Sequence, residues 1–303
     1  DYKVDIKTLD DARFHIKRVK DAGAISIKSY AHPRRDVRQL LLTAARELDM
    51  MVVPEGTGDY QDNMTMIVDG NTGIEHAVAL ANMYQDTTQL WSQTKSGYTP
   101  TLGVAYGGLA GENYWYQMTE VWKNQKLMSF VPNYIVKPNA IRPSKAPLEH
   151  YNHVYAAETA KKLRDAGVSV QLGAHGQREG LASHWEMWML NQGGFTPWQA
   201  IRAATIDGAN YLGMDKQLGS IEVGKLADLM IVDGEPLTNI RDSEKVIYTV
   251  LNGRIYDSAT MNQVGHYPQQ REKLYFNNNY ATPMHPATTK YIQTKAETYH
   301  WNH

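Results

Sequence analysis

One stretch of the sequence, residues 21–55, constrains the fold most strongly, because it predicts a complete strand–helix–strand unit. Short apolar runs occupy residues 24–27 and 50–53, and they lead to Lys28 and to Glu55, respectively. Parallel strands joined by a helix are buried on both faces, which is typical of such unbroken apolar runs. Lys28 and Glu55 are therefore expected at the carboxyl ends of neighbouring strands, where α/β folds place active sites. Between the strands, apolar residues recur at helical spacing: Val37, Leu40, Leu41, Ala44, Ala45 and Leu48.

The composition indicates a large globular core without cysteine chemistry. The chain has 303 residues, is 42% hydrophobic and carries a formal charge of −1, so we expect no nucleic-acid partner. No run of about 18 apolar residues occurs, and we therefore expect no membrane span. The absence of cysteine excludes disulfides, thiolate metal sites and cysteine nucleophiles. Because the chain begins at Asp1 without a methionine or a signal peptide, we interpret it as a piece of a longer protein.

Three further strands are predicted after this unit, and each carries a side chain of chemical interest near its carboxyl end. They cover residues 73–78 with His76, residues 99–106 ending in Tyr106, and residues 168–175 ending in His175.

Parallel strands bring their carboxyl ends to one rim, so Lys28, Glu55, His76 and His175 are expected to lie together. Taken singly, each has an ordinary structural explanation, such as a solvated lysine, a turn glutamate or a histidine satisfied in the core. Glutamate and imidazole suit zinc, iron or manganese. A lysine joins such a site only when its amine is neutral, which burial favours, and carbon dioxide can then convert the amine into a carbamate with two oxygen donors.

Two polar residues, His184 and Glu186, follow in a loop and helix start. Their spacing places them on different faces of a helix. We interpret His184 as a group that contacts substrate or supports the ligands, and Glu186 as a structural partner.

Near Gly219 the predicted elements change from alternating strands and helices to strands. We predict an α/β domain over residues 1–218, a small β element over 219–258 and a tail over 259–303. Within the β element, apolar runs lead into a two-residue Asn252-Gly253 hairpin turn.

Two carboxyl-terminal motifs resemble the amidohydrolase superfamily. Residues 219–233 (Gly-Ser-Ile-Glu-Val-Gly-Lys-Leu-Ala-Asp-Leu-Met-Ile-Val-Asp) are similar to its carboxyl-terminal signature, and the helix opened by Thr196-Pro197 is similar to the one that usually precedes it. With the strand-end residues, the resemblance extends over roughly residues 10–258. The segments around Glu55 and His175 are most similar to the branch found behind a TolB-like β-propeller in exported bacterial proteins. That branch implies a periplasmic or secreted location and possibly a propeller in the parent chain.

The resemblance implies a (β/α)8 TIM barrel that binds one or two divalent metals at its strand ends and hydrolyses amide or related bonds. Lys28 stands at the fourth-strand position of the bridging carbamate. Glu55 stands at the fifth-strand position that is normally histidine, and His76 at the sixth-strand histidine. His175 stands where the general-base aspartate of strand eight is usual. By the same count Tyr106 ends strand seven.

This sequence departs from the family pattern in two ways. The His-x-His of the first strand is missing, so we expect a partial barrel, strands about 4 to 8, followed by a small β-sandwich element. Upstream barrel strands would then belong to the parent chain. Glu55 and His175 replace the usual histidine and aspartate, which leaves open the number of metals and whether His175 is a base or a ligand.

These observations lead to an expected function and to two alternatives. We expect the parent protein to be a metal-dependent hydrolase of carbon–nitrogen bonds in small-molecule or peptide-like substrates, with zinc as the favoured metal and manganese or iron as alternatives. Lys28, Glu55 and His76 would hold the metal, while Tyr106 and His184 would contact or support the substrate. This fragment alone is expected to be inactive or nearly so. A decayed barrel used for ligand binding or as a scaffold is one alternative, and a lyase or isomerase is the other.

Overall fold

The computed structural model describes residues 4–30, 32, 34–78, 80 and 82–277. Residues up to 269 form one compact unit and residues 270–303 a second. The described part of the second unit contains the short 3-10 helix η5 (Tyr275–Asn277), and most of the predicted tail lies outside the described residues. No helix in the described ranges is long and apolar enough to cross a membrane. The predicted boundary near Gly219 falls inside the first unit.

Four short strands and one further residue form the framework of the candidate site. β1 (Ser26–Ser29) pairs with β2 (Met51–Pro54), and β3 (Gly73–Glu75) pairs with β4 (Gly97–Thr99). A bridge from Glu55 to Glu75 joins the two pairs, and a bridge from Tyr98 to Val170 adds a fifth position. All of these pairings are parallel, so the carboxyl ends lie along one edge. The mixed α/β fold that the sequence predicts is confirmed at this level.

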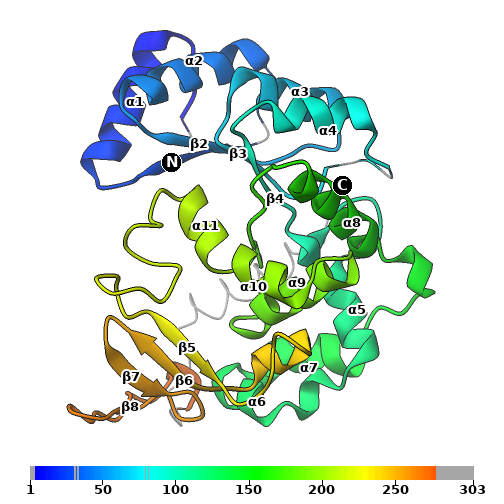
Figure 1. Ribbon diagram of the computed structural model, residues 1–303, viewed down its shortest axis with the longest axis vertical. Coiled ribbons are helices and arrows are strands. Elements are labelled where there is room, and N and C mark those ends of the chain that lie inside the picture. Colours follow the sequence, from blue (N-terminus) through cyan, green and yellow to red (C-terminus); the bar gives the residue numbers. More distant parts are fainter. Residues whose placement is uncertain (1–3, 31, 33, 79, 81, 278–303) are drawn as a thin grey trace, which may run out of the picture. The chain divides into compact units, whose positions relative to one another are not determined.

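Helices connect the strands and cover them. Figure 1 shows the first four helices along one side of β1 to β4. The predicted stripe of the second helix is buried at Val37, Ala44 and Ala45, which gives the strand–helix–strand unit its core. The four helices are α1 (Leu9–Asp21), α2 (Arg35–Glu47), α3 (Tyr60–Asp69) and α4 (Gln85–Ser92).

A second group of helices lies between β4 and Val170 and after it. Between the two come η1 (Leu102–Val104), α5 (Gly111–Met118), η2 (Val121–Lys123), α6 (Gln125–Phe130), α7 (Asn133–Ile141), η3 (Leu148–His150) and α8 (His153–Asp165). After Val170 come α9 (Leu181–Gln192), α10 (Pro197–Ala203) and α11 (Ile206–Tyr211). Thr196 caps α10 through its side chain, as the Thr-Pro pair predicts.

The predicted fourth and fifth strands differ from those in the structure. β4 ends at Thr99, and Pro100 and Thr101 lead into η1 instead of a strand that reaches Tyr106. Thr101 has a φ of 50°, which ends the extended conformation. Tyr106 therefore does not end a strand, and the prediction that it ends strand seven is wrong. In the predicted strand 168–175, only Val170 forms a bridge.

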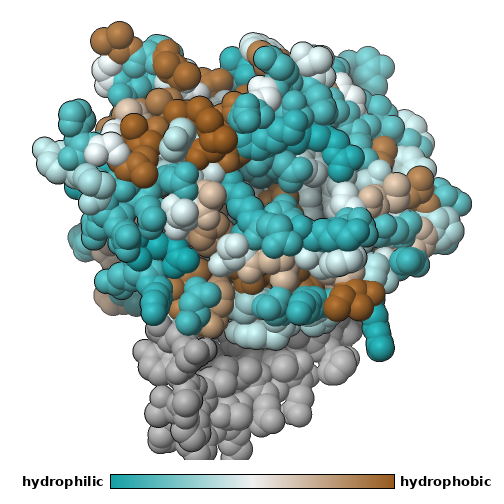
Figure 2. Space-filling view, turned by 90° about the horizontal axis from the view of Figure 1, so that it is seen from below, coloured by the Kyte–Doolittle hydropathy of each residue, from teal (hydrophilic) through white to brown (hydrophobic). Residues whose placement is uncertain are grey.

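The small β element is an antiparallel sheet of four strands in the order β5-β6-β7-β8. Within the described residues it is a single sheet, and the predicted β-sandwich is not confirmed. Figure 2 shows hydrophobic residues gathered toward the left of a mostly hydrophilic face, the side on which Figure 1 places this sheet. Large exposed apolar side chains of the sheet include Met230, Ile247, Leu251 and Ile255. The strands are β5 (Leu229–Val232), β6 (Val246–Leu251), β7 (Arg254–Asp257) and β8 (Gln263–Val264), so the sheet extends past the predicted limit at residue 258. η4 (Ile240–Glu244) lies between β5 and β6.

Two apolar clusters hold the first unit together. The smaller one joins α1, α2 and β2 through residues such as Ile16, Leu42 and Val52. The larger one surrounds β3 and β4 and includes Trp115 and Trp188. Full burial of a large apolar side chain contributes about 1.5–3 kcal/mol, so these clusters fix the strand ends against the surrounding helices.

Candidate active site

The strand ends bring Lys28, Glu55 and His76 together, as the sequence predicts. Lys28 lies within β1, and Glu55 and His76 directly follow β2 and β3. The Lys28 Nζ atom lies 2.7 Å from Glu55 Oε2. The His76 Nε2 atom lies 3.6 Å from Glu55 Oε1. Glu55 is thus the centre of the cluster, with a cation on one oxygen and an imidazole near the other.

Two more predicted residues, His175 and Tyr106, complete the cluster from loops. The rings of His76 and His175 meet edge to face, with centroids 5.0 Å apart. The Tyr106 ring stacks on His76 at 5.4 Å, and its hydroxyl lies 3.5 Å from the carbonyl oxygen of Gly56. Although Tyr106 ends no strand, it still forms one wall of the site.

The backbone is strained at both histidines of the cluster. His76 has a φ of 73° and His175 a φ of 57°, in the left-handed region that non-glycine residues rarely adopt. Such conformations cost about 1–3 kcal/mol each and concentrate at functional sites. Packing holds both imidazoles away from the direction that an extended strand would give them.

Burial sets the protonation of the two aromatic side chains that flank Glu55. Burial lowers the pKa of His76, with Glu55 opposing that shift and His175 and Lys28 adding to it. The pKa of Tyr106 is raised to about 12, first by burial and then by the charge of Glu55. At neutral pH the site therefore presents a neutral imidazole with a free lone pair and a phenol that keeps its proton.

The donor atoms of Glu55 and His76 fit a divalent metal as part of a ligand set. Among the described residues, no hydrogen bond reaches Glu55 Oε2 or the buried Nδ1 of His76, although Oε2 is ion-paired with Lys28. A carboxylate and a neutral imidazole suit zinc, manganese or iron. No group of three or more His, Cys, Asp or Glu in the described ranges is arranged to hold a metal ion. Glu55 and His76 alone can therefore supply only two ligands, which is fewer than a metal site needs.

Lys28 differs from the buried lysine that the carbamate argument assumed. Its side chain is 61% exposed and lies over the ring of Tyr30, 4.8 Å from the centroid. Burial therefore does not favour a neutral amine here, and that part of the sequence argument is wrong. Lys28 nevertheless lies at the predicted position next to Glu55.

The structure places His184 and Glu186 on α9, in separate environments. His184 Nδ1 lies 3.1 Å from Ser243 Oγ in η4, and burial lowers the pKa of His184 to about 4. The fully buried Glu186 accepts hydrogen bonds from the backbone of Leu102 and Gly103, at 2.6 and 3.0 Å. Glu186 is the structural partner that we expected. A role for His184 at the substrate stays a prediction.

Sequence reasoning missed three residues that surround His175. Gln177 Oε1 lies 3.0 Å from His175 Nδ1. The Gln177 side chain also interacts with the carboxyl of Glu112, in the first turn of α5, and lowers the pKa of that carboxyl. Arg178 is 4% exposed and donates from Nε to the hydroxyl of Tyr116 at 2.5 Å. Gln177 and Arg178 stand within three residues of a predicted site residue, whereas nothing in the sequence indicates Glu112.

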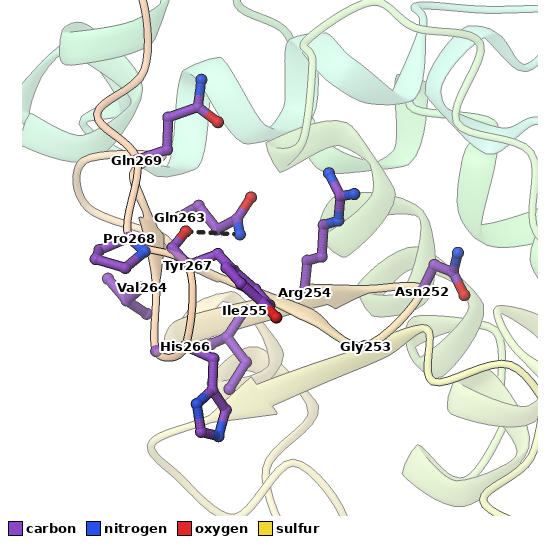
Figure 3. Close-up of a pocket in the computed structure, with 11 residues that line it drawn as sticks. Asn252, Gly253, Arg254, Ile255, Gln263, Val264, His266, Tyr267, Pro268 and Gln269 are labelled. Atoms are coloured by element: carbon purple, nitrogen blue, oxygen red, sulfur yellow. Dashed lines mark hydrogen bonds between the residues drawn. The ribbon is translucent and has the colours of Figure 1, made fainter.

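A cavity of about 840 Å³ lies away from these residues, beside β7 and β8. Figure 3 shows side chains such as Arg254, Gln263 and Tyr267 around it, and the Gln263 amide donates to the Tyr267 carbonyl oxygen at 2.8 Å. None of the predicted site residues lines this cavity.

Proteins of known sequence match this chain over about a quarter of its length. A 5'-deoxyadenosine deaminase from Methanobrevibacter smithii is 38% identical over 75 residues, which are 23% of this chain and 17% of that protein. An imidazolonepropionase from Geobacillus sp. is 36% identical over 81 residues, which are 25% of this chain and 19% of that protein. The chain thus covers less than a fifth of either protein.

Solved structures match over most of this chain. A Xaa-Pro dipeptidase with methionine bound in its active site has a TM-score of 0.61 at 22% identity, and the match covers 85% of this chain and 61% of that chain. A bottromycin amidohydrolase has a TM-score of 0.59 at 17% identity, with 84% and 60% covered. At these identities the likeness shows the fold alone, and this chain spans about three fifths of each structure.

The family comparison covers most of α8, the candidate base His175 and most of the small sheet. The sequence model described as the Amidohydrolase family matches residues 156–256, a range that ends before β8 and excludes Lys28, Glu55 and His76. Residues 156–256, about a third of this chain, therefore match the amidohydrolase family, and this match confirms the family recognised from the sequence.

Proposed function

We propose that the protein to which this chain belongs is a metal-dependent hydrolase of carbon–nitrogen bonds in small-molecule or peptide-like substrates. The observation that carries this proposal is the meeting of Glu55 with Lys28 and His76, and of His76 with His175, from three neighbouring parallel strands and the loop that follows Val170. The amidohydrolase domain supports the same reaction class. So do the names of similar proteins, since a deaminase and a dipeptidase both break carbon–nitrogen bonds.

Each residue of the cluster has a part in the proposed reaction. Glu55 and His76 would hold the divalent metal, zinc by preference. Lys28 would join them as a carbamate once the upstream barrel strands of the parent chain bury its amine, which is exposed in this chain. The metal supplies a bound water whose pKa is lowered toward neutrality. His175 accepts the proton that the attacking water loses and returns it to the leaving nitrogen. Tyr106 keeps its proton at neutral pH and can donate a hydrogen bond to the substrate.

Further features of the whole protein are proposed from the resemblance alone. The parent chain would contribute upstream barrel strands that complete the barrel and the ligand set, a second sheet that completes a β-sandwich, and a β-propeller as in the branch that this chain resembles. A periplasmic or secreted location follows from the same branch. This chain by itself would then be inactive, because the site lacks ligands.

Elemental analysis of the gently purified full-length protein tests the proposal. We expect one or two equivalents of zinc, manganese or iron, and a loss of bound metal and of metal-dependent turnover in the Lys28→Ala variant. Lys17→Ala is the matched control, because Lys17 is 65% exposed and pairs with Asp21 at 2.8 Å, much as Lys28 pairs with Glu55.

Either of two results would contradict the metal centre. Unchanged metal content and turnover in Lys28→Ala would remove Lys28 from the site. A folded wild-type protein without metal would instead favour a barrel that has lost its metal centre and binds a ligand without catalysing a reaction. If the protein turns over substrate, incorporation of solvent oxygen into the product separates hydrolysis from a lyase or isomerase reaction.

A further inference from the structure

The turn that follows His175 is attached to α5 at two points one helical turn apart. The Gln177 side chain interacts with the Glu112 carboxyl and lowers its pKa, and Arg178 Nε donates to the Tyr116 hydroxyl at 2.5 Å. Residues 112 and 116 are four apart and lie on one face of the helix. The Arg178 guanidinium also lies over the Tyr116 ring, 5.6 Å from the centroid. These contacts fix the turn against the helix.

The start of α5 is itself rigidly placed. A Cβ atom at Gly111 would lie 2.4 Å from the carbonyl oxygen of Leu102 and 2.6 Å from Met189 Sδ. The helix therefore begins in close contact with η1 and α9, and Figure 1 shows α5 and α9 near each other. Tyr116 is buried and packs edge to face on Trp185 of α9. Glu112 thus projects from a backbone that has little freedom to move.

The hydrogen-bond chemistry of these groups admits one arrangement while Glu112 is ionised. A carboxylate only accepts, so the Gln177 amide must turn its nitrogen toward Glu112. Its oxygen then faces His175, which agrees with the 3.0 Å between Gln177 Oε1 and His175 Nδ1. Because an amide oxygen only accepts, the proton of a neutral His175 must sit on Nδ1. The lone pair is then on Nε2, across the ring from Gln177.

We propose that Glu112, acting through Gln177, is a positioning residue that holds His175 as the Nδ1–H tautomer and leaves Nε2 as the nitrogen that accepts a proton or binds a metal. The partner of one imidazole nitrogen commonly decides which nitrogen is free for chemistry. Burial raises the pKa of Glu112, while Arg178 and the Gln177 hydrogen bond lower it, so Arg178 helps to keep the carboxylate charged. For its effect on turnover this inference rests on the proposed function, whereas the tautomer itself does not.

Nitrogen-15 NMR of the histidine-labelled chain tests the tautomer directly. The chain is freed of metal and studied at a pH above which the histidine signals no longer change. The His175→Gln variant identifies the His175 signals by their loss. We expect a protonated Nδ1 and a free Nε2 in the wild type, and a mixture of tautomers in Glu112→Gln, whose amide lets Gln177 turn over. Glu120→Gln is the matched control, since Glu120 follows α5 and pairs with Lys123 at the surface.

A protonated Nε2 in the wild type would overturn the inference, as would a Glu112→Gln spectrum identical to that of the wild type. The wild-type result stands even if a variant fails to fold. In the active full-length protein, loss of the positioning contact should lower kcat about 10- to 100-fold with little change in KM, and Glu112→Asp should restore part of it. If no hydrolase activity exists, the proposed function fails while the NMR result still decides the tautomer.

Discussion

The buried carboxyl of Glu186 should make the stability of this protein depend on pH in a specific direction. Glu186 is fully buried, and burial raises its pKa from 4.5 to about 8 against the effect of two backbone N–H donors. The folded state therefore keeps a proton between pH 4.5 and about 8 that the unfolded state has lost. Stability must then fall as pH rises through that interval, because the folded state binds more protons.

The size of the effect follows from the width of the interval. At about 1.4 kcal/mol per pH unit, the span from 4.5 to about 8 is worth roughly 5 kcal/mol. Glu186→Gln removes this dependence, because an amide does not titrate. The variant should cost about 1–3 kcal/mol at low pH, where its NH2 group faces one of the two backbone donors. Above pH 8 it should be more stable than the wild type.

Chemical denaturation of the wild type and of Glu186→Gln from pH 5 to pH 9 measures the difference. The difference in free energy of unfolding between the two proteins is more informative than either curve alone. Buried His153 and His184 have pKa values lowered to about 4, so below about pH 6.5 their effect on stability opposes that of Glu186. Glu158→Gln, at an exposed position of α8, is the control and should show a constant difference. A constant difference for Glu186→Gln would refute the reasoning, because it would mean that Glu186 is ionised throughout.

Three further outcomes follow from the packing and the charges. Gly111→Ala should lower the free energy of unfolding by about 1–3 kcal/mol, because the added Cβ overpacks against η1 and α9. Gly58→Ala is the control and should be close to neutral, because a Cβ there meets nothing within 4 Å. Thermal unfolding compares the two variants. His153→Gln should reduce the decrease in the free energy of unfolding between pH 6.5 and pH 4. Burial lowers the pKa of His153 to about 4, so the unfolded state binds the proton first as the pH falls. Acid denaturation of the wild type and the variant measures the difference. Lys28→Ala should change the free energy of unfolding by less than about 1 kcal/mol, because the Lys28 end of its ion pair is 61% exposed and screened by solvent. A large loss in equilibrium denaturation would show a structural rather than a ligand role.

The sequence predicted the strand ends because each combines an apolar run with a polar residue. Val52, Ile74 and Tyr98 are buried in the strands, and parallel pairing then brings the residues that follow them to one edge. Lys28, Glu55 and His76 met in the structure for this reason. Their convergence depends on topology alone, which a single sequence can predict.

Local patterns failed where a distant partner decides the conformation. The apolar run after Thr101 predicted a strand, yet it forms η1, whose backbone N–H groups are held by Glu186, 83 and 84 residues away. Likewise, α7 forms although Pro138 lies inside it. Buried Val136 and Ala140 attach this helix to the core, so tertiary packing outweighs the local cost of proline.

The same distinction separates the position of His175 from its chemistry. Its position follows from the chain order of parallel segments, so the sequence could predict that it lies beside His76. Its ring orientation depends on Gln177 and, through it, on Glu112 in α5, 65 residues away along the chain. The helices from α5 to α7 lie between β4 and Val170, and no sequence pattern ties them to the site. A barrel can therefore keep its strand-end residues while helices between two of its strands change which imidazole nitrogen is free, and with it the acid–base chemistry of the site.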